Sequence, residues 1–207
     1  LYSSAASDVY KRQAKKHQLE ARQDEAGNVL ITKPATPGKE QTPGVVLQAH
    51  MDMVCEKNAD TVHDFDKDPI KPYIDGEWVK AKGTTLGADD GIGIAAALAV
   101  LTDENIQHGP LECLFTVDEE TGLTGAFALQ PGFFQGKILL NLDSEDEGEI
   151  FIGCAGGIDT VIRLPYRKMV LPAHKFAVQV KVKGLQGGHS GDDINKGRAN
   201  ANKLLNR

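Results

Sequence analysis

The sequence predicts an α/β fold, a sheet with helices on its faces, followed by a segment of antiparallel strands. Short apolar runs alternate with helical segments from Asn28 onward, and an acidic residue or a histidine follows four of the strand-like runs. Strand–helix–strand alternation of this kind is typical of a sheet covered by helices. After the glycine cluster at residues 153–157 the runs instead alternate apolar and polar residues, which is typical of half-exposed antiparallel strands.

The predicted strands of the first part are short apolar runs bounded by turn residues. They cover residues 29–32, 45–48, 78–82, 111–117 and 137–142. A Pro/Gly-rich turn separates the first two, and the aspartate-rich stretch 56–75 is predicted to be a loop. Residues 91–101 are rich in alanine, a strong helix former, and follow Asp89-Asp90, where aspartate is favoured as a helix cap. A helix is therefore predicted there.

The domain organisation follows from these changes in pattern. Residues 1–13 have neither a signal-peptide architecture nor a clear amphipathic period, and they resemble a translated linker, so we expect a non-native leader outside the fold. Residues 14–156 are expected to form part of a first domain. Residues 157–207 are expected to begin a second, with antiparallel strands at 159–164 and 176–182. Residues 198–207 indicate a helix that stops without a cap, so both ends are expected to be truncated.

Composition excludes some classes of partner. The 23 basic and 29 acidic residues give a net charge of −6, which argues against nucleic-acid binding because phosphate contacts need clustered Lys and Arg. The longest apolar run, residues 92–101, is well short of the roughly 20 residues that a membrane span needs. Cys55, Cys113 and Cys154 are widely separated, which favours reduced, buried thiols in a cytoplasmic protein.

A first candidate site follows the run 45–48. His50 and Asp52 are two residues apart, and in an extended chain such residues point to the same side. A metal-binding imidazole commonly donates its other N–H to a carboxylate, which fixes the orientation of the ring. An isolated His-x-Asp motif is more often an ordinary pair of surface residues, so this motif needs support from elsewhere in the chain.

Acidic residues at three further positions supply that support. Asp89 and Asp90 lie in a glycine-rich turn before the predicted helix, the run 118–120 follows one strand, and Asp143 follows another. Adjacent carboxylates repel one another, which is tolerable on a solvated loop but requires cations in a cleft. Because the carboxyl ends of strands form the binding crevice of open α/β sheets, these side chains are expected to gather there. Together with the histidine they suit zinc or manganese.

Two other classes of protein stay open on this evidence. Residues 91–96 match the loose dinucleotide fingerprint GxGxxA, although residues 80–88 before them are not a buried strand and the aspartates would repel a pyrophosphate. A homologue that binds metal without catalysis is the other possibility. Thermal stabilisation by zinc or manganese but not by NAD would exclude the dinucleotide-binding protein.

Five longer stretches carry a specific resemblance. They are LQAHMDMVCEKN, GTTLGADDGIGIAAALAVL, LFTVDEETGLTGA, NLDSEDEGEIFIGCAGGID and KGLQGGHSGDDINKGRANAN. They resemble the bacterial aminoacyl-histidine dipeptidases, enzymes that cleave Xaa-His dipeptides or carnosine within the two-zinc M20-type metallopeptidase family. The similarity runs from about Asn28 to Arg207, and the motifs are long, ordered and correctly spaced. It implies a catalytic domain of the zinc-peptidase kind, with a mixed sheet and flanking helices, interrupted by the start of an α+β lid domain.

The resemblance assigns metal ligands to four positions, namely His50, Asp89, Glu120 and Asp143. Asp89 would bridge two divalent metal ions. Zinc is the expected metal, with manganese or cobalt as alternatives. Asp90, its neighbour, falls outside the matching ligand position. The family takes a further histidine ligand for the second metal from a later part of the chain.

Three other residues receive catalytic roles from the same resemblance. Asp52 would orient the ring of His50, Glu119 would be the general base, and His189 would stabilise the oxyanion from the lid. After Glu120 no histidine fits the missing ligand position, since His174 and His189 both lie in the lid-like segment. We therefore expect the chain as given to bind the second metal poorly and to be inactive.

The implied activity of the whole protein is hydrolysis of dipeptides, preferentially Xaa-His, by a metal-activated water. A nearer alternative is aminoacylase or deacetylase action on N-acyl amino acids within the same family. The expected partners are small dipeptides and, in the full-length form, a second copy in a homodimer. Neither nucleic acid nor a membrane is expected.

Overall fold

The computed structural model describes residues 4–207 apart from 145, 155, 159, 171 and 189–192. The chain divides into two units, Leu1–Glu147 and Gly148–Arg207. This division precedes the change at residues 156/157 that the sequence pattern suggests.

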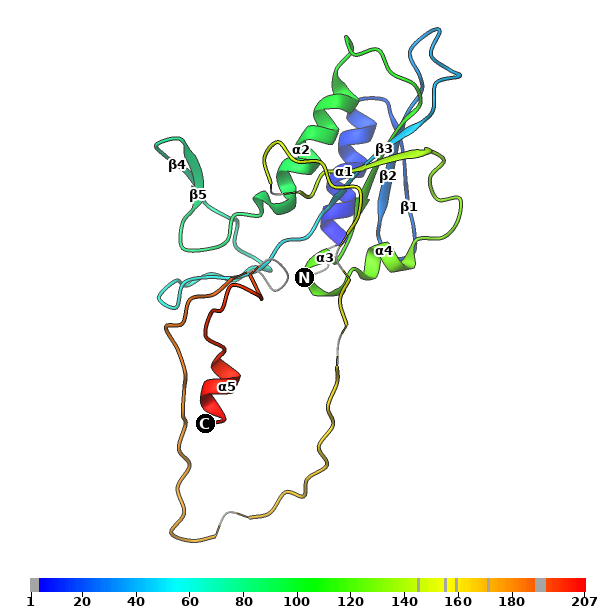
Figure 1. The fold of residues 1–207 in the computed structure, drawn as a ribbon. Helices are drawn as coiled ribbons and strands as arrows, with labels where there is room; N and C mark the ends of the chain where they lie inside the picture. Colours follow the sequence, from blue (N-terminus) through cyan, green and yellow to red (C-terminus); the bar gives the residue numbers. More distant parts are fainter. Residues whose placement is uncertain (1–3, 145, 155, 159, 171, 189–192) are drawn as a thin grey trace. The chain divides into compact units, whose positions relative to one another are not determined.

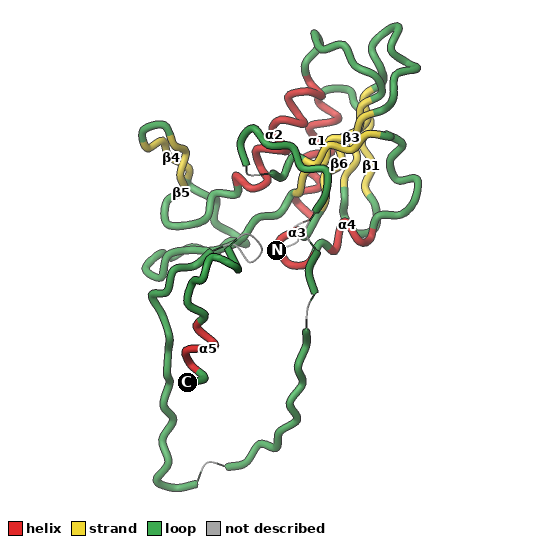
Figure 2. The backbone as a smooth tube through the Cα atoms, viewed as in Figure 1, coloured by secondary structure: helices red, strands yellow, loops and turns green. Residues whose placement is uncertain are grey.

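The first unit is built on a five-stranded mixed sheet (Figures 1 and 2). In spatial order its strands are β1 (Glu20–Gln23), β2 (Val29–Lys33), β6 (Leu111–Thr116), β3 (Val45–His50) and β7 (Ile138–Asn141). The strands β1, β2 and β6 pair antiparallel, whereas β3 pairs parallel with both β6 and β7. The prediction of a mixed sheet with flanking helices is confirmed, and four of its strands lie where the apolar runs indicated.

Helices cover one face of this sheet. The helix α2 (Ala88–Thr102) packs on β3 and β6, and α1 (Ser4–Lys16) packs on β1 and β2 (Figure 1). The core on this face contains Ala14, Val29, Ile31, Leu47, Ala49, Ile94, Ala97, Leu101, Cys113 and Phe115. On the opposite face Leu30, Val46 and Leu114 pack against Leu129, Phe133 and Phe134. The short helices α3 (Glu119–Gly122) and α4 (Thr124–Ala128) follow β6. Among the described residues, no helix is both long and apolar enough to cross a membrane.

The helix α1 corrects the expectation that residues 1–13 lie outside the fold. Ser7 and Ala14 are buried, the Ser7 hydroxyl donates to the Gly27 carbonyl at 2.8 Å, and the Tyr10 ring lies 5.0 Å from the Phe115 ring. These residues recur at helical spacing and face the sheet. Because two of the three are small or polar, an apolar period does not reveal them.

Two further expectations about local structure need correction. Residues 72–75, predicted as loop, form β4 (Pro72–Asp75), which pairs with β5 (Trp78–Ala81) in a hairpin outside the main sheet. All four β4 residues are exposed, so pairing across a tight turn, not burial, makes this strand. The cysteines are free as expected, but only Cys113 is buried and Cys154 is exposed.

The second unit has little regular structure in its described part. Its helix α5 (Ala201–Leu205) begins at Asn200, whose side chain accepts from the Lys203 N–H at 3.1 Å. The antiparallel strands predicted at 159–164 and 176–182 are not formed in the described residues. Alternation of apolar and polar residues gives a strand two faces but does not supply a partner, and a strand is stable only when paired.

A buried asparagine joins the start of β2 to the segment that follows β6. The Asn28 amide donates to Asp24 Oδ2 at 2.7 Å and to the Gly125 carbonyl at 2.8 Å, and its oxygen accepts from the Val117 N–H at 3.1 Å. Asn28→Ala leaves buried polar groups without partners, so we expect it to lower the free energy of unfolding by about 2–3 kcal/mol. Urea unfolding measures the change. Asn58→Ala, at an exposed position, is the control, and equal stability of the two variants would contradict the expectation.

Candidate metal centre

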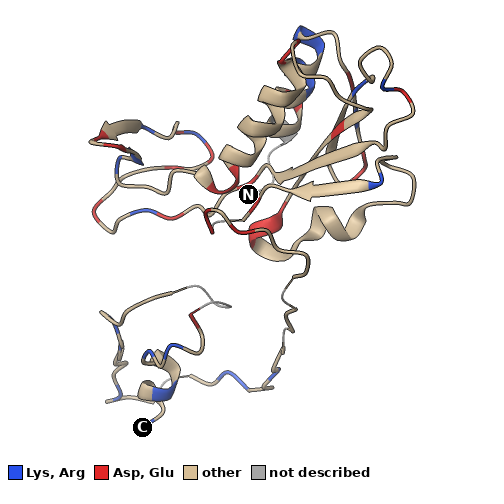
Figure 3. Ribbon diagram, turned by 45° about the horizontal axis from the view of Figure 1, so that its top comes forward, with Lys and Arg blue, Asp and Glu red and all other residues tan. Residues whose placement is uncertain are grey.

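The candidate site lies where the parallel strands end. His50 is the last residue of β3 and pairs with Thr116 at the end of β6, while Gln48 pairs with Asn141 at the end of β7. Glu119 and Glu120 begin α3 shortly after β6, and Asp89 lies in the first turn of α2. Acidic residues therefore lie at the starts of both helices at this edge of the sheet (Figure 3).

Two groups of side chains meet at His50. One consists of His50, Asp89 and Glu120, and the other of His50, Asp90 and Asp143; within each, the candidate ligand atoms lie within 4.8 Å of one another. The structure thus brings together all four residues that the resemblance assigns to metal binding. His189 lies outside the described residues.

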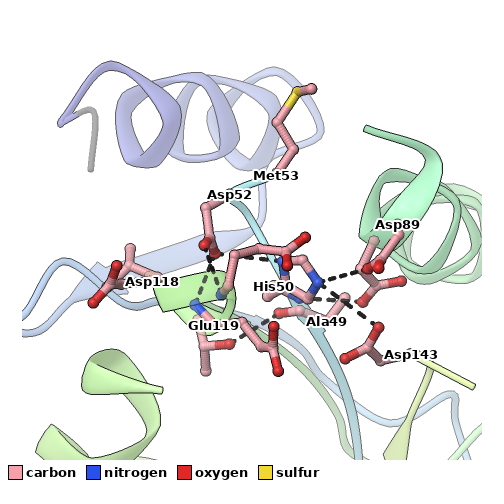
Figure 4. Close-up of polar contacts among 12 residues, drawn as sticks. Ala49, His50, Asp52, Met53, Asp89, Asp118, Glu119 and Asp143 are labelled. Carbon is pink, nitrogen blue, oxygen red and sulfur yellow. Dashed lines mark hydrogen bonds and ion pairs between the residues drawn. The ribbon is translucent and has the colours of Figure 1, made fainter. Parts of the chain in front are cut away.

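The ring of His50 is held between carboxylates (Figure 4). Its Nε2 lies 2.8 Å from Asp89 Oδ1 and 3.7 Å from Asp143 Oδ1, while Nδ1 lies 3.4 Å from Asp52 Oδ1, an ion-pair contact without hydrogen-bond geometry. Burial opposes protonation, but the three carboxylates outweigh it and raise the pKa of His50 to about 10. The Nε2 atom therefore faces the carboxylates of Asp89 and Asp143, and Nδ1 faces Asp52.

The carboxylate of Asp52 also holds the start of α3. It accepts from the backbone N–H of Glu119 at 3.0 Å and of Glu120 at 3.1 Å. Burial alone would raise the pKa of Asp52, but His50 and these two N–H groups lower it to about 2. Asp52 is thus an anion at neutral pH, and it fixes the end of β3 relative to the two glutamates.

The remaining carboxylates crowd one another. Burial, with repulsion from Asp90, Asp89 and Glu119, raises the pKa of Asp143 to about 7 despite the opposing attraction of His50. Burial and the negative charge of Asp89 likewise raise the pKa of Glu120. A divalent cation would remove this repulsion. One imidazole and several carboxylates are also ligand types that zinc takes, so the donor set fits such an ion.

The start of α2 differs in part from the predicted aspartate cap. The N-cap residue is Gly87, which makes no side-chain cap hydrogen bond, but Asp89 and Asp90 have non-helical backbone angles within the helix. Asp90 Oδ1 accepts from the Gly93 N–H at 3.2 Å, a contact of the kind that a capping aspartate makes. Residues 91–96 therefore lie inside a helix with carboxylates near its start. They do not form a strand-to-helix phosphate loop, which removes the support for a dinucleotide-binding protein.

Two aspartates next to the predicted ligands lie in positions that the sequence did not indicate. Asp118 accepts from the hydroxyls of Thr121 and Thr124 and points away from His50, so it is not part of the cluster (Figure 4). Asp90, placed outside the ligand set, has its carboxylate in the cluster beside His50 and Asp143. Its role as a helix cap was visible in the sequence, but its contact with the end of a distant strand was not.

Comparison with known proteins agrees with this geometry. The model of peptidase family M20/M25/M40 matches residues 46–180. The chain is 60% identical over 194 residues to the cytosol non-specific dipeptidase of Escherichia coli K12, covering 94% of this chain and 40% of that protein.

Solved structures give the same picture. The aminoacylhistidine dipeptidase of Vibrio alginolyticus superposes with a TM-score of 0.73 at 52% identity, over 97% of this chain and 41% of that one. The aminopeptidase PepT of Bacillus cereus superposes with a TM-score of 0.56 at 32% identity, over 67% and 37%. The chain thus spans about two fifths of the length of the Escherichia coli and Vibrio alginolyticus proteins. Fold, strand-end cluster and sequence agree that the chain belongs to peptidase family M20/M25/M40.

Proposed function

We propose that this chain supplies the metal-binding part of a dipeptidase that hydrolyses dipeptides, preferentially Xaa-His, at two divalent metal ions. The observation that carries the proposal is the convergence of His50, Asp89, Glu120 and Asp143 at one edge of the sheet. The names of the two relatives support dipeptide substrates over N-acyl amino acids. One of them is named for aminoacyl-histidine, and the other as non-specific, which favours a preference for histidine over an absolute requirement.

Each side chain of the site has a separate task in this proposal. The four ligands hold the ions, which when bound lower the pKa of water and polarise the scissile carbonyl. Asp52 faces Nδ1 of His50 and so presents Nε2 to the ion. Glu119 accepts the proton of the attacking water and passes it to the leaving amine. In the described part of the chain, the Glu119 carboxylate makes no hydrogen bond or ion pair, while its backbone is fixed by Asp52.

We also propose how this chain corresponds to the domains of its longer relatives. Residues 14–156 would belong to the catalytic domain, and residues 157–207 would begin the lid, from which His189 would stabilise the oxyanion. Among the described residues after Glu120, His174 is the one histidine, and it is exposed in the second unit. A further ligand for the second ion would come from the part of the relatives that this chain does not cover. We further propose that the ions are zinc, that the protein is cytoplasmic and that its full-length form is a homodimer.

Replacing the general base should separate catalysis from metal binding. Glu119→Gln removes no ligand, so in an enzyme extended to the length of the relatives we expect normal zinc content and a kcat lower by about 10²–10⁴-fold with a Xaa-His dipeptide. Asp89→Asn should lower zinc content and kcat together. Metal analysis beside steady-state kinetics tests both, with exposed Glu104→Gln as the control. Near-normal turnover of Glu119→Gln would show that another group is the base.

Metal uptake by this chain should release protons. At pH 7 a His50 with a pKa of about 10 is protonated, and an Asp143 with a pKa of about 7 is half protonated. Both groups must lose their protons to become ligands, so affinity should rise with pH, with roughly 1–2 protons released per chain at pH 7. At pH 9 the number should fall toward about one, because Asp143 is already ionised.

Calorimetric titration with zinc in buffers of different ionisation enthalpy measures this release directly. A slope of zero against ionisation enthalpy at pH 7 would mean that the ion does not displace the proton of His50. The variant Asp143→Asn serves as the internal control, since it should retain the part of the release that belongs to His50.

A further inference from the structure

The buried carboxylate of Asp90 joins two segments that carry metal ligands. Asp90 is 1% exposed. Its Oδ2 accepts from the backbone N–H of His50 at 3.2 Å, and its Oδ1 accepts from the backbone N–H of Gly93 at 3.2 Å. The first N–H belongs to the last residue of β3 and the second to α2, three residues after Asp90. A helix cap uses one of these contacts, so the other calls for a separate explanation.

Gly93 leaves the space that this carboxylate occupies. A Cβ atom at Gly93 would lie 2.2 Å from Asp90 Oδ1 and 2.9 Å from its carboxyl carbon. A Cβ atom at Gly91, two residues earlier in the same helix, would meet nothing within 4 Å. Glycine is unfavourable inside a helix, so its presence at position 93 needs a reason such as this close approach.

We propose that Asp90 and Gly93 form a clamp that sets the position of His50 relative to Asp89. Asp90 is a positioning residue in this clamp: its two oxygens are engaged by backbone N–H groups, and it acts on the metal through its neighbours. Asp89 directly precedes it in the chain, so fixing Asp90 against the end of β3 also fixes the ligand beside it. The clamp rests on the proposed metal-binding function and extends it to two residues without an assigned role.

The physical reason for such a clamp is the spacing of the ligands. His50 Nε2 and Asp89 Oδ1 come from a strand and a helix, and both must reach one ion at about 2.0–2.2 Å. The segment between residues 50 and 89 is largely exposed loop and hairpin. Its two arms are joined by backbone contacts such as that of the Thr85 N–H with the Glu56 carbonyl at 2.9 Å, but these lie several residues from either ligand. Groups that orient metal ligands typically change metal affinity by about 10–100-fold when they are removed.

The test compares four variants of this chain with the unmutated protein: Asp90→Ala, Gly93→Ala, Gly91→Ala as the matched control, and the double variant Asp90→Ala with Gly93→Ala. Zinc affinity is measured by competition with a chromophoric chelator, and cobalt absorption reports ligand geometry. Circular dichroism locates the unfolding transition, so that binding is compared well below it. The cobalt spectrum is the readout that a loss of stability alone would not move in a folded variant.

Asp90→Ala and Gly93→Ala should each weaken zinc binding by about 10–100-fold and alter the cobalt spectrum, while Gly91→Ala behaves like the unmutated chain. The double variant should bind no more weakly than Asp90→Ala, because the side chain that the new methyl group displaces is already absent. Asp90→Asn, which keeps one acceptor oxygen and the shape of the side chain, should give an intermediate loss and covers the case in which Asp90→Ala does not fold.

Three results would overturn the clamp alone: zinc affinity of Asp90→Ala or Asp90→Asn equal to that of the unmutated chain, Gly93→Ala indistinguishable from Gly91→Ala, or additive losses in the double variant. An unmutated chain that takes up no zinc would overturn the proposed function and the clamp with it. The two failures are therefore distinguishable from the same set of titrations.

Discussion

Parallel pairing of β3 with β6 and β7 is the constraint on which the site depends. It places the carboxyl ends of three strands at one edge of the sheet, with His50 opposite Thr116 and Gln48 opposite Asn141. Each strand then delivers its ligand within a few residues of its end. The sheet interior can be rigid and apolar, while the chemistry is confined to short segments at one edge.

The contacts between these segments are themselves charged. Asp52 connects the end of β3 to the start of α3, and Asp90 connects the same strand end to the start of α2. Both carboxylates are buried, so each is costly unless backbone N–H groups or a histidine pair with it. The repulsion that remains lies among the carboxylates of Asp89, Glu120 and Asp143, and a divalent cation bound there would offset it and stabilise the fold.

Much of the first unit could be predicted from the sequence, because its strands are buried apolar runs and its ligands follow them directly. The helix α1 could not, since Ser7 and Ala14 are buried without forming an apolar stripe. The strand β4 is exposed and depends on its hairpin partner, which composition does not reveal. The runs at 159–164 and 176–182 show the converse case, in which a strand-like period finds no partner in the described residues. Residues that act across long sequence separations, such as Asp90 on His50, are invisible to any local pattern.

We propose a metal centre at the strand ends, formed by His50, Asp89, Glu120 and Asp143. X-ray absorption at the zinc edge of the zinc-loaded protein reports the ligand atoms of this centre. We expect nitrogen and oxygen ligands at about 2.0–2.2 Å, with an imidazole contribution that disappears in His50→Ala. A shell containing sulfur at about 2.3 Å, or a spectrum unchanged in His50→Ala, would contradict it.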